Sequence, residues 1–399
     1  MPFGKFIKYV FSYLFIIPIS KIKTNLKSKA IRKEYFGDGT IDTCYIAVNI
    51  GNAGIGDAIV AIRFLRDFVD FVGSSIVFDI FYRSPDSIKF ITAALPNARR
   101  VLNLPDYTLL RKFYDIDLKL NTFFIKEEIN ELSRDKIYKK FPSVLKIIES
   151  IKTNRSPLEK YIKTRPFSEG ILSDAVTAMG LSRASYLNNI AGIATPTDTL
   201  KLNIAIYPTT TAKFNLQGVK FITVHDGWDE NTKTKTGSST KSYPPQKWSE
   251  LVNLLKQEFP GHITVQLGGL GNGSNIEGID LNLRGKTTLK EAASLLAASS
   301  LHIDTDSGLV HIAVSMGTLC AVLFGPTNAA YCSHSRFPNY IAVTPSLCGN
   351  CWWSTYDWME TCPRGLDVPE CMNSIEPIDI INKIKIKLNV NIKQTQAAV

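Results

Sequence analysis

An α/β fold made of two doubly wound halves is what three observations predict for this chain of 399 residues. Short apolar runs of strand length alternate with amphipathic stretches of helical period, which is typical of parallel sheets. The alternation occurs twice, before and after a polar stretch at 185–203 that has no strong period. In each half a loop leads from a strand into a helix, which is where such sheets bind ligands. We therefore expect two Rossmann-like domains that face a central cleft.

The elements follow from the apolar patterns. Predicted strands of the first half are 43–50, 74–83, 99–104 and 114–123, and its helical patterns are 58–71, 85–95 and most of 126–180. In the second half the predicted strands are 220–227, 262–269, 301–306 and 319–325, and the helices are 248–259, 288–299, 308–317 and 376–389. The chain then divides into an arm (1–40), two domains (41–200 and 201–345), a cysteine-containing segment (346–373) and a C-terminal helix with a tail (374–399).

The positive charge of the chain is concentrated in the arm. The chain has 46 Lys and Arg against 36 Asp and Glu, and eight of the basic residues lie in residues 1–33, which contain no acid. The remaining 38 basic residues nearly balance the acids. A nucleic-acid-binding protein would carry basic charge over its body, so we expect no nucleic-acid partner.

The arm also has helical amphipathicity, because its large apolar residues recur every three or four positions. Its apolar run at 9–19 is too short to cross a bilayer, and no secretory cleavage site follows it. We therefore expect a cytoplasmic protein. An amphipathic helix with a polybasic flank fits the inner-membrane surface, which would make residues 1–33 a membrane contact. The alternative is a helix docked on the protein itself.

The first loop, GIGD at 54–57, places two glycines and an acid where a helix begins. Gly54 and Gly56 let the backbone approach a ligand, and a helix N-terminus favours negative charge. The glycine spacing is only loosely that of a dinucleotide site, and no acid ends the next strand. Asp57 is either an acid that favours the helix dipole or a general base that faces the cleft.

A long polar loop follows the strand at 220–227 and closes on Pro244 and Pro245 before a helix. Thr240 and Lys241 lie just ahead of that helix, where a hydroxyl and an ammonium can meet a diphosphate. The alternative is a surface loop whose lysines are only solvated.

The stretch DTDSGLVH at 304–311 leaves two interpretations open. Asp304 and Asp306 share one face of a strand, which is compatible with a divalent metal. Alternatively, Asp306 or Ser307 caps the next helix, and the N–H groups near Gly308 bind an anion. His311, on the first turn, is either a pocket residue or a core histidine.

Taken together, these loops resemble glycosyltransferase family 9, the ADP-heptose-dependent heptosyltransferases of GT-B architecture. The resemblance rests on GIGDAIVAIRFLR, TKSYPPQKWSELVNLL, LGG at 267–269 and, most specifically, DSGLVHIAVSMGTLCAVLFGPTN at 306–328. It covers roughly residues 43–390 and is weakest between 105 and 215. The sequence departs from the family in its basic arm and its longer loop at 225–240.

The resemblance implies a metal-independent inverting transferase that uses ADP-heptose and a glycan (lipopolysaccharide-like) or protein acceptor. It implies that Asp57 is the base for the acceptor hydroxyl and that Lys241, with Thr240, binds the diphosphate. It also implies the donor-site residues Asp306, which holds sugar hydroxyls, Ser307, Gly308, His311 and Glu277, the nearest acid after 267–269. The Asp-x-Asp pattern would then have no metal role.

Four of the seven cysteines, Cys348, Cys351, Cys362 and Cys371, lie close together in the sequence. A Cys-x-x-Cys pair followed by two more thiols is typical of a tetrahedral metal site. The segment between them is too short to form its own core. Without a secretory signal a structural metal is favoured over two disulfides or buried thiols. The arrangement looks like the iron-binding finger of family members that heptosylate autotransporters, and zinc suits four thiolates equally.

Two other functions remain open. One is a GT-B enzyme that uses another nucleotide sugar, or an epimerase, which the five histidines of the chain disfavour. The other is a non-catalytic relative that binds glycan or assembles on a partner. A homo-oligomer is compatible with each of them.

Overall fold

The computed structural model describes residues 36, 42–73, 75–95, 97–162, 164–165, 167–195, 200–227, 239–271 and 275–397. The predicted amphipathic arm at 1–33 lies outside the described residues. Most of the polar loop that follows residue 227 also lies outside them. Within the described part of the chain, no helix is long and apolar enough to cross a membrane.

The N-terminal half is built on a five-stranded sheet in the order β3-β2-β1-β4-β5. Its strands are β1 (Cys44–Gly51), β2 (Ile76–Tyr82), β3 (Ala98–Asn103), β4 (Ile116–Asn121) and β5 (Phe124–Ile129). The first four are parallel, and β5 pairs antiparallel with β4. Strand β5 corrects the prediction that helix begins near 126. Its alternation of exposed Lys126 and Glu128 with buried Ile125 is that of a half-buried edge strand.

Helices cover this sheet, and they are α3 (Ile55–Val72), α4 (Pro85–Thr92), α5 (Leu104–Leu110), α6 (Arg134–Lys140), α7 (Pro142–Asn154), α8 (Phe167–Ala178) and α9 (Tyr186–Ala191). Helix α9 corrects the interpretation of 185–203 as a plain connection. Leu187 and Ile190 are buried in the N-terminal core, and Gly192 ends the helix with a φ of 67°. The connection to the second half therefore begins only after α9.

The C-terminal half is built on a six-stranded parallel sheet in the order β11-β10-β9-β6-β7-β8. Its strands are β6 (Phe221–His225), β7 (Ile263–Gln266), β8 (Leu281–Asn282), β9 (Leu301–Thr305), β10 (Cys320–Leu323) and β11 (Tyr340–Val343). Its helices are α10 (Thr209–Lys213), α11 (Pro245–Glu258), α12 (Leu289–Ala298), α13 (Gly308–Met316), α14 (Ala329–Cys332), α15 (Glu370–Asn373) and α16 (Pro377–Ala397). The edge strands β8 and β11 were not predicted, because runs of two and four residues carry little periodicity.

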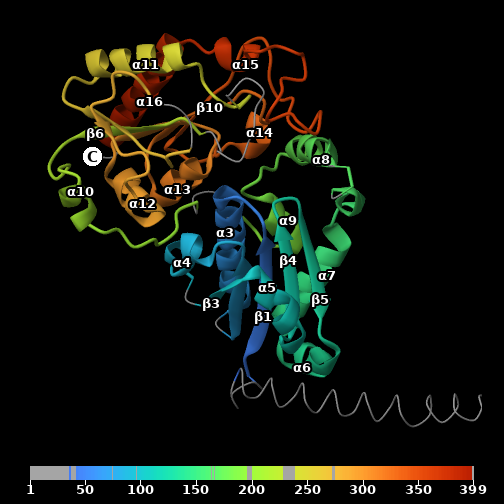
Figure 1. Ribbon diagram of the computed structural model, residues 1–399. Helices are drawn as coiled ribbons and strands as arrows, with labels where there is room; N and C mark the ends of the chain where they lie inside the picture. Colours follow the sequence, from blue (N-terminus) through green and yellow to red (C-terminus); the bar gives the residue numbers. More distant parts are fainter. Residues whose placement is uncertain are drawn as a thin grey trace, which may run out of the picture.

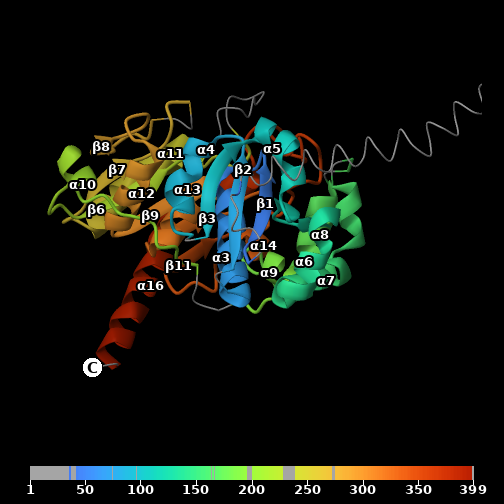
Figure 2. The same cartoon turned by 90° about the horizontal axis from the view of Figure 1, so that it is seen from below.

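The two halves lie one above the other in Figure 1, with α3 and α13 adjacent at their boundary. Figure 2 shows the sheets side by side when the molecule is seen from below. A single hydrophobic cluster runs through both halves, with members such as Phe64 of α3 and Ile312 of α13. The predicted α/β class with two doubly wound halves is thus confirmed.

A buried carboxylate organises one face of the N-terminal sheet. Asp79 of β2 is 1% exposed, and its Oδ2 accepts hydrogen bonds from Arg100 at 2.7 Å and from the Tyr114 hydroxyl at 2.5 Å. Arg99 donates to the same carboxylate. Burial alone would raise the pKa of Asp79, but these hydrogen bonds outweigh it and lower the pKa below 3.8.

We expect Asp79→Asn to lower the free energy of unfolding at pH 7 by about 2–3 kcal/mol, because it removes the charge that the arginines pair with. A lowered folded pKa stabilises the fold above pH 3.8 and loses its effect as pH falls further. The difference from the unchanged protein in urea unfolding should therefore shrink toward pH 3. Asp86→Asn is the control, since its ion pair with Lys89 is exposed and is expected to contribute under about 0.5 kcal/mol. Equal effects of the two changes would contradict the prediction.

Candidate active site

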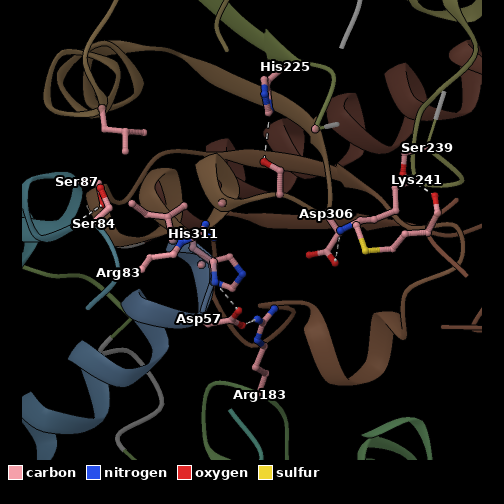
Figure 3. Close-up of a pocket in the computed structure, with 18 of the residues that line it drawn as sticks. Asp57, Arg83, Ser84, Ser87, Arg183, His225, Ser239, Lys241, Asp306 and His311 are labelled. Atoms are coloured by element: carbon pink, nitrogen blue, oxygen red, sulfur yellow. Dashed lines mark hydrogen bonds and ion pairs between the residues drawn. The ribbon is translucent and has the colours of Figure 1, made fainter. Parts of the chain in front are cut away.

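A cavity of about 630 Å³ lies between the two halves, at the carboxyl ends of both sheets. The first half contributes the turn that leads into α3, and the second contributes the turn that leads into α13 (Figure 3). The sequence-predicted residues that line it are Gly54, Gly56, Asp57, Lys241, Asp306, Ser307, Gly308 and His311. Residues that are distant in sequence are thus brought to one site.

A second cavity, of about 290 Å³, lies in the C-terminal half. It is lined by Gly268 and Gly269 after β7 and by Thr287 and Thr288 before α12. The two cavities share the four lining residues Ile55, His225, Leu289 and Gly308. The N-terminus of α13 therefore lies at the junction of an outer space between the halves and an inner space within one of them.

Two glycines allow helices α3 and α13 to begin side by side. A Cβ on Gly308 would lie 2.1 Å from Cγ2 of Ile55, and a Cβ on Gly56 would lie 2.6 Å from Cδ2 of His311. Ser307 caps α13, and its Oγ accepts the N–H of Leu309 at 3.1 Å. The starts of both helices thus line one cavity, and the positive end of a helix dipole favours an anion there.

Lys241 and Asp306 form an ion pair on one wall of the cavity, with Nζ 3.4 Å from Oδ2. Both side chains are largely buried, at 17% and 10% exposed. The distance is longer than the roughly 2.7–2.9 Å of a strong charged hydrogen bond, so an anionic ligand can compete for the ammonium.

Asp57 is held on the opposite wall by two contacts. Its Oδ2 accepts the N–H of Gly54 at 3.1 Å, and its Oδ1 forms an ion pair with Arg183 (Figure 3). The first contact is that of an acid at a helix start, and the second fixes the other oxygen inside the cavity. Sequence reasoning missed Arg183, because it lies in the loop before α9 and nothing local marks it.

His311 lines the cavity and is also buried, so both interpretations of it hold in part. Its Nδ1 lies 3.1 Å from Nε2 of His334, and it is 2% exposed. Burial first, and then the charges of His334, Arg183 and Arg63, hold the pKa of His311 well below 6.5. It is therefore a neutral ring that packs against Gly56.

Asp304 and Asp306 serve different partners. Asp304 is fully buried, and its carboxylate contacts Nδ1 of His225 at 3.0 Å, Nε2 of His302 at 3.2 Å and the Ser307 hydroxyl at 2.5 Å. Only Asp306 lines the cavity. Among the described residues, no three or more His, Cys, Asp or Glu side chains are grouped so that they could hold a metal ion. Asp304 and Asp306 are therefore not part of such a group.

Two predicted donor-site residues lie elsewhere. The Thr240 hydroxyl donates to the carbonyl of Trp358 at 2.7 Å, so it points at the cysteine-containing segment, and Ser239 lines the cavity in its place. Glu277 is exposed and lines neither cavity. For Thr240 the reason is that the side of its loop that faces the cavity depends on the segment that packs behind it.

The cysteine-containing segment packs behind Lys241. The N–H of Thr240 donates to the Met359 carbonyl at 3.0 Å, and the Ser239 hydroxyl donates to the same carbonyl at 3.2 Å. Met359 itself lines the cavity. At its other end the segment reaches the turn after β10, where the N–H of Asn350 donates to the Gly325 carbonyl at 3.1 Å.

The four thiols of this segment are free and interact electrostatically. Burial raises the pKa of Cys371 to about 12, and the neighbouring Cys348, Cys351 and Cys362 add to the rise. Burial also raises the pKa of Cys351, again with help from Cys348 and Cys362. The thiols are therefore neighbours, although they do not form a ready ligand set.

We expect Thr240→Val to loosen the segment that carries Lys241, because it removes one hydrogen bond while keeping the side-chain shape. A local loss of about 1–2 kcal/mol should speed amide hydrogen exchange at Lys241 and Ser242 by roughly 5- to 30-fold. Thr211→Val is the control, since its hydroxyl bonds to Pro208 at the start of α10. Unchanged exchange at Lys241 and Ser242 would show that the Thr240 hydroxyl does not hold the segment.

Comparison with known proteins finds a family match for one part of the sequence. Residues 232–342 match the family model of glycosyltransferase family 9 (heptosyltransferase). A stretch of 51 residues is 43% identical to lipooligosaccharide heptosyltransferase 2 of Haemophilus influenzae, and it spans 13% of this chain and 15% of that protein. The resemblance to family 9 is thus confirmed for residues 232–342.

Solved structures extend the likeness to most of the chain at the level of fold. Heptosyltransferase II of E. coli superposes with a TM-score of 0.55 at 14% identity, over 88% of this chain and 99% of that one. A family 9 glycosyltransferase from Veillonella parvula gives 0.54 at 15% identity, over 87% and 98%. The iron-containing dodecameric glycosyltransferase TibC of enterotoxigenic E. coli gives 0.56 at 15% identity, over 88% and 77%. The chain has the GT-B fold of these glycosyltransferases, and its residues 232–342 carry the family 9 sequence pattern.

Proposed function

We propose that this protein is an inverting glycosyltransferase that moves heptose from ADP-heptose to a glycan or protein acceptor. The observation that carries the proposal is the arrangement of three groups around one cavity. A carboxylate, Asp57, faces it from the first half, and Lys241 and the start of α13 face it from the second. The family 9 pattern of residues 232–342 supports the same reaction class.

The proposed reaction has one displacement step. The acceptor oxygen bonds to the anomeric carbon of the donor, and its proton passes to Asp57. The bond from that carbon to the diphosphate breaks, and its electron pair stays on the phosphate oxygen. Attack from the face opposite the leaving group inverts the sugar carbon.

The leaving diphosphate gains negative charge where positive groups are already placed. Lys241 lines the outer cavity, and Gly308 at the start of α13 lines both cavities. Groups fixed before the reaction stabilise developing charge without reorganisation. The inner cavity is the space for the nucleoside, and the outer cavity holds the sugar and the acceptor.

Partners and location follow from the same proposal. We expect a nucleotide-sugar donor and a lipopolysaccharide-like or protein acceptor, without nucleic acid. TibC is dodecameric, and a homo-oligomer is proposed for this chain on that likeness. A cytoplasmic protein with residues 1–33 on the inner-membrane surface is proposed from the charge of the arm alone. The alternatives are another nucleotide sugar, or a relative that binds glycan without catalysis.

The test is calorimetric titration with ADP-heptose beside UDP-, GDP- and CMP-sugars, followed by transfer assays. ADP-heptose should bind selectively, and Lys241→Ala should lower turnover about 100-fold or more. Asp57→Asn should lower turnover by about 10²- to 10⁴-fold and keep donor binding. Lys256→Ala is the control, because Lys256 of α11 pairs with Asp280 and neither residue lines either of the two cavities. Full transfer by Asp57→Asn would exclude Asp57 as the base, and absence of any nucleotide-sugar binding would favour the non-catalytic alternative.

We also propose that the four cysteines, Cys348, Cys351, Cys362 and Cys371, hold one structural metal ion, iron or zinc. Support comes from four free, mutually interacting thiols in a segment with little core of its own. A cation would offset the repulsion between their thiolate forms. Because no ready ligand set exists among the described residues, the segment would have to close around the ion.

We expect about one equivalent of metal per chain in protein purified without chelators, measured by mass spectrometry. Replacing Cys348 and Cys351 by Ser should release it and lower the thermal midpoint. Replacing Cys44, which lies in β1 of the other half, with Ala should leave the metal content unchanged. Less than roughly 0.3 equivalents in the unchanged protein would contradict the metal and leave reduced thiols as the better description.

A further inference from the structure

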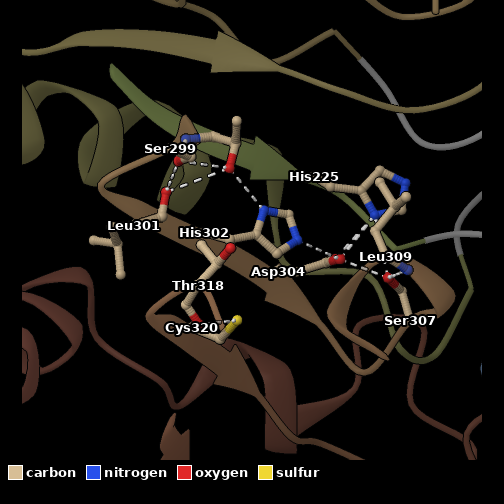
Figure 4. Close-up of polar contacts among 10 residues, drawn as sticks. His225, Ser299, Leu301, His302, Asp304, Ser307, Leu309, Thr318 and Cys320 are labelled. Carbon is tan, nitrogen blue, oxygen red and sulfur yellow. Dashed lines mark hydrogen bonds and ion pairs between the residues drawn. The ribbon is translucent and has the colours of Figure 1, made fainter. Parts of the chain in front are cut away.

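A row of buried, hydrogen-bonded side chains runs along the C-terminal sheet and ends at the cavities. It passes from Thr223 through His302 and Asp304 to His225 (Figure 4). Thr223, His302 and Asp304 are fully buried, and His225 is 5% exposed. Of these four residues, only His225 lines the cavities, so it is the one that a ligand could contact.

Asp304 fixes the orientation of the His225 ring. Its two carboxylate oxygens each lie 3.0 Å from Nδ1 of His225. The Ser307 hydroxyl donates to the same carboxylate at 2.5 Å and links the pair to the cap of α13. With Nδ1–H donating to Asp304, the ring must present its other nitrogen, Nε2, to whatever lies beyond it.

What lies beyond is the junction of the two cavities. His225 lines both of them, together with Gly308 at the start of α13. The ring lies against Gly268, where a Cβ would be 2.9 Å from Cδ2 and 3.2 Å from Nε2. The absence of a side chain at Gly268 therefore leaves the Nε2 side of His225 beside the inner cavity.

The charges around His225 favour its protonated form. Burial and the nearby Arg284 lower the pKa of His225, whereas the charge and hydrogen bond of Asp304 and the charge of Asp226 raise it. Burial is the largest single effect, but the net pKa lies above 6.5. The carboxylate of Asp304 is held below its ordinary pKa of 3.8 because His225 and His302 outweigh its burial.

We propose that His225 binds the diphosphate of the nucleotide donor through Nε2–H, as a second cation beside Lys241. The inference rests on the proposed function and adds a catalytic residue to it. His225 touches the leaving group, and Asp304 acts through His225 as a positioning residue. Neither residue takes up the acceptor proton, which goes to Asp57.

The arrangement assigns separate tasks to the two cations. Lys241 lies in a loop that is hydrogen-bonded to the cysteine-containing segment through Thr240. Its ammonium also forms an ion pair with Asp306. His225 is anchored at the end of β6 by a buried carboxylate, so its ring is fixed before the donor arrives. A hydrogen-bond donor that is fixed before the reaction stabilises the departing diphosphate at a lower free-energy cost than one that must reorganise.

The test is the pH dependence of ADP-heptose binding, measured by calorimetry from pH 6 to 9. Both phosphates of this donor are esterified, so the ligand itself does not titrate in that range. Affinity should be constant below the pKa of His225 in the folded protein and should fall as pH rises through it. His225→Asn keeps a donor for Asp304 and lacks the Nε2 group, and it should lower affinity about 10- to 100-fold at pH 7 and remove the pH dependence.

Two further variants separate this role from a structural one. Asp304→Asn keeps the shape of the side chain but removes its charge, so affinity should begin to fall at a lower pH. His262→Asn is the matched control, since His262 lies at the opposite end of the sheet, beside Ser300. It should leave affinity and its pH dependence unchanged. Thermal unfolding of each variant checks that it is folded.

If His225→Asn does not fold, the unchanged protein still gives an answer. The NMR titration of the His225 ring should show a higher pKa with ADP-heptose bound than without it, and an equal pKa would overturn the proposal. Donor binding with unaltered pH dependence in His225→Asn would overturn it and leave the proposed function standing. If no nucleotide sugar binds the unchanged protein, both fail. Should a UDP- or GDP-sugar bind instead, the same titration is run with it, because it has the same diphosphate. Binding of a CMP-sugar alone, which has a single phosphate, would overturn the proposal.

Discussion

The molecule depends on a contact between two helix starts that leaves no room for a side chain. At Gly308 a Cβ would come within 2.1 Å of Ile55, and at Gly56 it would come within 2.6 Å of the His311 ring. Because α3 belongs to one half and α13 to the other, these glycines set how closely the halves approach. The cavity exists because both helices present their N-termini to the same space. Any shift of one half against the other would move Asp57 relative to Lys241 and separate two groups that the proposed reaction needs together.

The boundary between the halves also buries charged side chains, and ion pairs line the cavity. Arg63 of α3 is 3% exposed and donates to the Ser315 hydroxyl at 2.9 Å, across the boundary between the halves. Burial, followed by the charge of Arg66, lowers its pKa to about 9, which still leaves the guanidinium charged at neutral pH. Within the cavity Lys241 pairs with Asp306, and Arg183 pairs with Asp57. Lys241 and Asp57 thus each have a partner of opposite charge, and an anionic ligand that binds Lys241 would compete with Asp306.

Local signals in the sequence predicted much of this arrangement, and long-range packing decided the rest. Buried parallel strands have continuous apolar runs, and the turns GIGD and DSG mark where helices begin, so the sheets and the residues Asp57, Asp306 and Gly308 could be found by pattern. Arg183 could not, because its partner lies more than a hundred positions away along the chain. His225 could not be identified from the sequence, because its partner Asp304 lies on a strand that is adjacent only in the folded sheet. Thr240 was assigned to the donor because nothing in its own loop reveals that Trp358 packs behind it.

The packing behind Lys241 gives the cysteine-containing segment a place in the site. Three hydrogen bonds join Ser239 and Thr240 to the carbonyls of Trp358 and Met359, between Cys351 and Cys362. The other end of the segment is tied to the turn after β10, so its two attachments hold the Lys241 loop against the C-terminal sheet. A short segment with few buried apolar groups cannot keep such a position by packing alone. A constraint on its four thiols, such as the proposed metal ion, would therefore also hold in place the loop that carries Lys241.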